Sequence, residues 1–153
     1  MLRRGPGAKF MPNSLVFPGG VLDESDLRFP REKTDFADGE VCGKRSPICL
    51  GLDDDVALRV CAIRELFEEG GLLPVVEGDK PFLANAEGDV HLAEWRRKIM
   101  AEPESFAQLF HNRFRMSVSS LMPWSNWLTP LASRSGPRQE TQIKSLQMFI
   151  LTV

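Results

Sequence analysis

Apolar residues recur at helical spacing between residues 55 and 69, and two glycines, Gly70 and Gly71, follow them. At about 100° per residue, four apolar side chains fall on one side of such a helix, namely Val56, Val60, Ile63 and Phe67. Glu65, Glu68 and Glu69 fall on roughly the opposite side. The pattern therefore predicts an amphipathic helix that stops at the glycine pair and carries its carboxylates on one strip.

Shorter patterns predict the other elements. Residues 14–22 are mostly apolar and strand-like, and they contain Pro18-Gly19-Gly20, a sequence typical of a tight turn or of close backbone approach. Residues 23–52 are polar and rich in glycine, proline and charge, which predicts a long loop or a partly ordered insertion. We further expect two short helices within residues 88–114, broken near Pro103, and strands at residues 72–76, 122–130 and 146–153.

The overall composition is that of a globular protein. The chain has 153 residues, of which 42% are hydrophobic and 26% charged, with a formal net charge of −2, so it suits a single folded unit with its own core. This charge balance provides no general basic surface for nucleic acid, and no apolar run approaches the roughly 18 residues that a membrane span needs. We therefore expect neither nucleic acid nor membrane as a partner. Three cysteines match no zinc or redox spacing, which predicts free thiols.

The carboxylate strip is the main candidate for chemistry. Like charges three and four residues apart repel each other on a helix, so a bound cation would relieve them. Mg²⁺ takes carboxylate oxygens together with substrate phosphates. Arg64 adjoins the strip and is placed to pair with one carboxylate and fix its rotamer. A solvated acidic face is the simpler explanation of three glutamates at this spacing.

The detailed pattern favours the metal site. Residues 64–72, Arg-Glu-Leu-Phe-Glu-Glu-Gly-Gly-Leu, fit R-E-U-x-E-E-x-G-U at every specified position, where U is a bulky aliphatic residue. This sequence resembles the signature of the Nudix hydrolases, which cleave a nucleoside diphosphate linked to another moiety. The pair Gly19-Gly20 after a strand belongs to the same pattern. The resemblance implies an α/β (α+β) Nudix fold in which a mixed β-sheet is sandwiched between helices.

The resemblance also assigns roles to residues. It implies that Mg²⁺ or Mn²⁺ is the cofactor, held by the three glutamates, with the Gly19 backbone carbonyl as a further ligand. Glu65 or Glu68 would orient or deprotonate the attacking water, and Arg64 would orient a carboxylate. Because the residue that acts as general base differs among Nudix branches, the sequence leaves the choice between Glu65 and Glu68 open.

The spacing departs from the usual signature, which is G-x5-E-x7-R-E-U-x-E-E-x-G-U. Gly20 stands 44 residues before Arg64, and the position eight residues before Arg64, where a glutamate is expected, is Val56. The nearby aspartates at positions 53–55 are the candidates to replace that glutamate. A long insertion after Gly-Gly-Val-Leu-Asp, residues 19–23, resembles the peroxisomal acyl-coenzyme A diphosphatase branch of the family. Similar stretches are residues 10–12, Phe-Met-Pro, and residues 124–130, Trp-Ser-Asn-Trp-Leu-Thr-Pro.

That branch implies a substrate and a division of the chain. The substrate would be coenzyme A or acyl-coenzyme A, a small molecule, and the products 3′,5′-ADP and (acyl-)4′-phosphopantetheine. The Nudix domain would occupy residues 1–130, with the insertion at 23–52 and a divergent tail at 131–153. A coenzyme A pattern, R-[SA]-x3-R-x3-G-x3-F-P-G-G, places Arg4, Lys9 and Gly20 at the substrate, although an exposed basic N-terminus explains the two cations equally well.

Several alternatives stay open. A catalytically weak or silent Nudix-like module that binds a nucleotide or a partner is one, and a hydrolase of another nucleoside diphosphate-linked substrate is another. Both ends are expected to lack strands of the Nudix fold, and the final Leu-Thr-Val differs from a Ser-Lys-Leu peroxisomal address, so a cytoplasmic location is an alternative to a peroxisomal one. His91 and His111 have no partner at a recognisable spacing, which predicts surface or packing roles for both.

Overall fold

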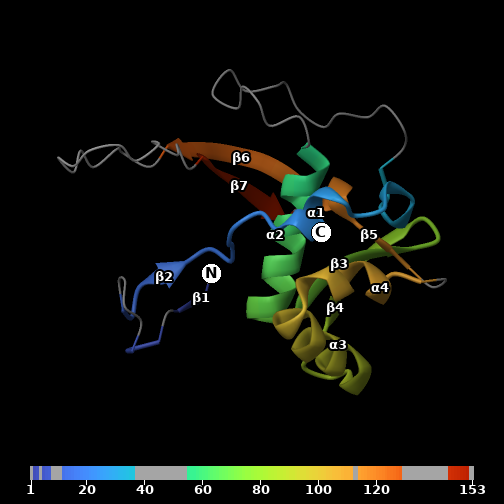
Figure 1. The fold of residues 1–153 in the computed structure, drawn as a ribbon, viewed down its shortest axis with the longest axis horizontal. Helices are drawn as coiled ribbons and strands as arrows, with labels where there is room; N and C mark the ends of the chain where they lie inside the picture. Colours follow the sequence, from blue (N-terminus) through green and yellow to red (C-terminus); the bar gives the residue numbers. More distant parts are fainter. Residues whose placement is uncertain are drawn as a thin grey trace.

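A long central helix organises the fold. The computed structural model describes residues 2–3, 5–7, 12–36, 55–111, 114–128 and 145–151. Helix α2, Asp55–Gly70, stands in the middle of the molecule (Figure 1). Val60, Ile63 and Phe67 are each 0% exposed, and Val56 packs against the same core while partly buried. The amphipathic helix predicted from the apolar spacing is therefore confirmed.

The core of α2 faces an antiparallel sheet. Strands β3 (Leu72–Glu77), β4 (Lys80–Asn85) and β5 (Arg115–Met116) form this sheet in the order β4-β3-β5. Strand β3 confirms the prediction for residues 72–76. Strand β4 was not predicted, because its Phe82 and Leu83 are both 38% exposed and its sequence has no clear apolar alternation. A turn with φ of +61° at Gly78 brings β4 back onto β3.

The helices that follow β4 break where expected. Helix α3 spans Val90–Ala101, and Asp89 caps it by accepting hydrogen bonds from the amides of its first turn. Glu102 has left the helical conformation (φ −141°, ψ 83°), as the residue before a proline tends to do, and a 3-10 turn η3 (Pro103–Ser105) leads into α4 (Phe106–Leu109). The predicted break near Pro103 is confirmed. Phe106, together with Phe110 after α4, completes an aromatic cluster around Phe29.

The first part of the predicted loop is ordered structure. Helix α1 (Glu24–Leu27) and the 3-10 turn η1 (Arg31–Lys33) lie in it, and Thr34 forms an isolated parallel bridge with Met116 of β5. Of the two alternatives predicted, a partly ordered insertion agrees with residues 23–36, because buried side chains such as Phe29 dock this segment on the core. The rest of the predicted insertion, residues 37–52, lies outside the described residues.

Two further strand pairs complete the described chain. The strand expected at residues 14–22 is limited to β2 (Leu15–Val16), which pairs with β1 (Leu2–Arg3). After a 3-10 turn, η4 (Val118–Ser120), strand β6 (Leu121–Leu128) pairs antiparallel with β7 (Ser145–Leu151), confirming both predicted strands. Figure 1 shows β1 and β2 on the opposite side of α2 from β3 and β4.

The α+β class is confirmed. The described strands form three antiparallel sheets, and helices pack beside them. Within the described residues, no helix is long and apolar enough to span a membrane.

Candidate active site

Arg64 is the centre of the candidate site. Its side chain is 4% exposed, and its Nε and Nη2 atoms donate to the two carboxylate oxygens of Asp26 at 2.9 Å each. Its Nη1 atom donates to Glu65 at 3.0 Å and to Glu68 at 2.9 Å. Burial lowers the pKa of the guanidinium, but the hydrogen bonds to Asp26 and Glu68 outweigh this effect and hold it above its ordinary value. A permanent positive charge therefore fixes two of the three carboxylates of the strip.

Asp26 supplies the carboxylate that seemed to be missing. It stands six positions after Gly20, where the usual signature has its first glutamate, and its side chain is 1% exposed. The insertion comes after Asp26 and lengthens the chain between it and Arg64, so that the position eight residues before Arg64 is Val56. Counting forward from Gly20, rather than backward from Arg64, would have found it.

Val56 packs against the core and lies outside this ion-pair network. Of the three aspartates proposed as replacements, those at positions 53 and 54 lie outside the described residues. The partner of Arg64 from outside α2 that carries a negative charge is Asp26 of α1. Its carboxylate also accepts a hydrogen bond from the Asp23 amide at 2.9 Å. Helix α1 is thereby tied to α2 through a buried ion pair.

The glycine pair lies directly against the carboxylates. A β-carbon at Gly20 would overlap the carboxylate of Glu65, so no other residue fits this position without displacing Glu65. The Gly19 amide donates to Glu69 at 3.3 Å, and the Val21 carbonyl accepts from Arg64 at 3.3 Å. The structure thus brings Gly19 to Glu69 and Gly20 to Glu65, and Arg64 joins Glu65 to Glu68.

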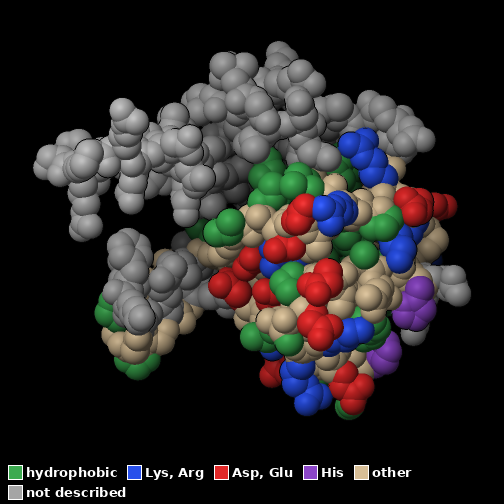
Figure 2. All heavy atoms as spheres, viewed as in Figure 1, with side chains coloured by type: hydrophobic (Ala, Val, Ile, Leu, Met, Phe, Trp, Pro, Cys, Tyr) green, Lys and Arg blue, Asp and Glu red, His purple; other side chains and the backbone are tan. Residues whose placement is uncertain are grey.

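The electrostatics of the strip favour a cation. The side chains of Glu65 and Glu68 are 14% and 17% exposed, and Glu69 is exposed. Burial raises the pKa of Glu65, and the charges of Glu68 and Glu69 add to this effect, while Arg64 opposes it. Figure 2 shows acidic side chains gathered over the same part of the molecule as the lower end of α2. A positive ion at this place would relieve the mutual repulsion.

The strip does not form a closed metal cage. In the described part of the chain, no three side chains of His, Cys, Asp or Glu are arranged to hold a metal ion by themselves. Mg²⁺ commonly keeps several waters and binds through one or two carboxylates plus substrate phosphates, rather than in a cage made of protein alone. The donors present, which are hard carboxylate oxygens beside an open glycine pair, fit an ion bound in that way.

Two predicted substrate contacts, Arg4 and Lys9, fall outside the described residues. His91 is exposed and accepts a hydrogen bond from Trp95 at 3.3 Å, and His111 is exposed with its Nδ1 atom 3.0 Å from the Gln108 carbonyl. Both histidines thus have local partners, in agreement with surface roles.

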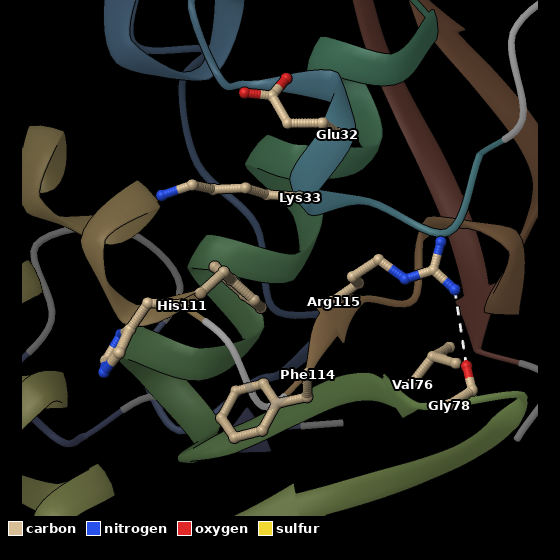
Figure 3. Close-up of a pocket in the computed structure, with 8 residues that line it drawn as sticks. Glu32, Lys33, Val76, Gly78, His111, Phe114 and Arg115 are labelled. Atoms are coloured by element: carbon tan, nitrogen blue, oxygen red, sulfur yellow. Dashed lines mark hydrogen bonds between the residues drawn. The ribbon is translucent and has the colours of Figure 1, made fainter.

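A separate open hollow of about 590 Å³ lies between η1, the segment that follows α4, and the β3–β4 turn (Figure 3). Its cationic side chains contact backbone carbonyls: Lys33 donates to Ala107 at 2.8 Å, and Arg115 donates to Gly78 at 3.5 Å. No carboxylate of the strip lines it.

Comparison with known proteins agrees with this geometry. The family model described as the NUDT19 Nudix domain matches residues 1–144. The chain belongs to the Nudix family. No solved structure gives a significant match.

Curated relatives support a specific branch of this Nudix family. The acyl-coenzyme A diphosphatase NUDT19 of Xenopus laevis is 35% identical over 164 aligned positions, which cover 88% of this chain and 42% of that protein. The proteins of the same name from Gallus gallus and Homo sapiens are 34% and 33% identical, and each alignment covers 92% of this chain and 45% of the relative. The chain therefore spans less than half the length of these relatives.

Proposed function

We propose that this Nudix domain hydrolyses the pyrophosphate bond of coenzyme A or acyl-coenzyme A, giving 3′,5′-ADP and (acyl-)4′-phosphopantetheine. The observation that carries the proposal is the buried Arg64, which holds Glu65 and Glu68 beside the glycine pair. The substrate class is supported by the acyl-coenzyme A diphosphatase name shared by the relatives from frog, chicken and human.

The proposed cofactor is Mg²⁺ or Mn²⁺, with Glu65, Glu68, Glu69 and the Gly19 carbonyl as its candidate ligands. When bound, such an ion would neutralise charge on the phosphates and favour attack by water. The chain's own groups position the reactants. Arg64 keeps two carboxylates in place without being able to give up its proton, since its pKa lies above the ordinary value.

In the hydrolysis itself, an oxygen–phosphorus bond forms from water, and the bond from that phosphorus to the bridging oxygen breaks. The water proton passes to a carboxylate, and the bridging oxygen leaves on the other phosphate. We propose Glu65 as the acceptor, because Gly20 lies directly against its carboxylate. Gly20 leaves room at this carboxylate because it carries no side chain. Arg4 and Lys9 are the proposed contacts for the substrate phosphates.

A silent binding module is the second candidate function. The loss of the first signature carboxylate would favour it, but Asp26 stands six positions after Gly20 and pairs with Arg64. A Nudix hydrolase of another nucleoside diphosphate-linked substrate is a variant of the first proposal, and a substrate panel separates the two.

The test is incubation of the purified chain with coenzyme A and Mg²⁺ or Mn²⁺, followed by chromatography for 3′,5′-ADP. We expect product from the wild type and from Glu94→Gln, an exposed position on α3, and none from Glu69→Gln. Circular dichroism establishes that each variant is folded. Product from Glu69→Gln at the wild-type rate would overturn the site assignment, and a folded wild type that binds coenzyme A without product would favour the silent module. The peroxisomal location implied by the resemblance is tested by imaging the protein in cells.

A further inference from the structure

The last turn of α2 is held by a side chain from another helix. Arg96 of α3 donates from Nε to the backbone carbonyl of Glu68 at 2.9 Å, and from Nη2 to the backbone carbonyl of Glu69 at 3.0 Å. These are two of the three residues whose carboxylates form the strip. By contacting their main chain, Arg96 therefore holds the backbone from which two of the candidate metal ligands project.

The two carbonyls that Arg96 binds are at the end of α2, where the helix itself provides no hydrogen-bond donors. The last four carbonyls of an α-helix lack partners within the helix. Gly71, with φ of +70°, satisfies the first of them through a 2.9 Å hydrogen bond from its amide to the Phe67 carbonyl. The next two carbonyls, those of Glu68 and Glu69, accept from Arg96.

The charge of Arg96 also suits its position. The C-terminal end of a helix carries a partial negative charge, which a nearby cation stabilises. The last turn of α2 itself contains no basic residue, and two of its residues are glutamates. Arg96 lies close beside Gly71, where a β-carbon would be 3.6 Å from its Nη1 atom, so the guanidinium packs against the turn that ends the helix.

The two glutamates are consequently held at both ends. At the carboxylate end, Arg64 binds Glu68 and the Gly19 amide binds Glu69. At the backbone end, the carbonyls of both residues are held by Arg96. Helix ends fray when their carbonyls lack partners, and fraying of this turn would spread the positions of the carboxylates.

We infer that Arg96 is a positioning residue for the metal-binding carboxylates, acting through the backbone of Glu68 and Glu69. This inference rests on the proposed function of the strip. Arg96 contacts main-chain oxygens, so its effect on any reaction is indirect. Sequence patterns gave no indication of it, because Arg96 lies 27 and 28 positions from the two residues it holds.

The experiment measures Mn²⁺ binding in the absence of substrate, by the electron paramagnetic resonance signal of free Mn²⁺, for the wild type and four variants. Arg96→Gln should raise the Kd for Mn²⁺ about tenfold, the lower part of the range seen when partners of metal ligands are lost. Arg96→Lys should give a smaller increase, since an ammonium cannot match the planar fork that spans two carbonyls. Arg97→Gln is the control and should bind as the wild type does, because Arg97 is exposed and, within the described part of the chain, donates to Ala93 of its own helix at 3.4 Å. Glu69→Gln reports whether the signal comes from the strip.

The outcomes separate the two proposals. If the wild type binds no Mn²⁺, or if Glu69→Gln binds it equally well, the metal site fails and the inference fails with it. If the wild type binds Mn²⁺ through Glu69 while a folded Arg96→Gln has an unchanged Kd, the inference alone is overturned, even where the variant melts at a lower temperature. If Arg96→Gln does not fold, Arg96→Lys decides, and an unchanged Kd in that variant overturns the inference.

Discussion

The buried ion pair between Asp26 and Arg64 provides the sharpest stability test. The perturbation is Asp26→Asn, which keeps the size of the side chain and removes its charge. Asp26 and Arg64 have side chains that are 1% and 4% exposed, and two hydrogen bonds of 2.9 Å join them. The variant therefore leaves the buried guanidinium without the partner that binds it through both carboxylate oxygens.

The size of the effect follows from burial. Removing one partner of a buried ion pair costs about 3–5 kcal/mol. Arg64 retains its bonds to Glu65 and Glu68, which offset part of the loss, so we expect about 3 kcal/mol, the lower end of that range. At about 2–4 °C per kcal/mol for a domain of this size, Tm should fall by roughly 6–12 °C.

The assay is thermal and urea unfolding followed by circular dichroism, without metal or substrate. The matched control is Glu24→Gln in the same short helix, because the Glu24–Arg28 ion pair is 71% and 74% exposed. A surface pair of this kind contributes about 0.5 kcal/mol or less, so the control should melt within about 2 °C of the wild type.

The reasoning fails if Asp26→Asn loses no more stability than Glu24→Gln. That result would mean that Arg64 is satisfied by Glu65, Glu68 and water alone, and that Asp26 is not the structural equivalent of the first signature carboxylate.

Three further predictions follow from the site and the core. Gly20→Ala should lower the rate of coenzyme A hydrolysis at least about tenfold, because the added methyl group would displace the Glu65 carboxylate. The control is Gly88→Ala, whose added methyl group meets nothing within 4 Å and should leave the rate unchanged. Equal rates for the two variants in a kinetic assay would contradict the close approach of Gly20 to Glu65. The pKa of Glu65 is raised in the folded state, so the native domain binds a proton at this carboxyl group more tightly than the unfolded chain does. The wild type should therefore gain stability relative to Glu65→Gln as the pH falls from neutral toward the ordinary glutamate pKa of about 4.3. Melting curves across that pH window check the sign, and a relative loss would refute it. Burial raises the pKa of Cys61 to about 12, so in a variant whose other two cysteines are serine a thiol reagent at pH 8 should react only after unfolding.

Local patterns in the sequence determined the central helix and its chemistry. Apolar spacing placed Val60, Ile63 and Phe67 on the core side, and the same periodicity put the glutamates on the other face. Pro103 separates α3 from α4, because its ring disfavours the helical conformation at the preceding residue, Glu102. These features depend on neighbours within a few positions along the chain, so the sequence alone determines them.

Long-range contacts were decided only by the tertiary structure. Asp26 lies 38 positions from Arg64, and Gly19 lies 50 positions from Glu69. The intervening insertion hid the signature spacing, and nothing in the sequence indicated that Arg96 would hold the end of α2. Such contacts form when burying apolar residues, among them Phe29, brings distant segments together, and the buried charges must then find partners within reach. Periodicity carries no information about where those segments meet, so the pairing of Arg64 with Asp26 emerges only from the folded chain.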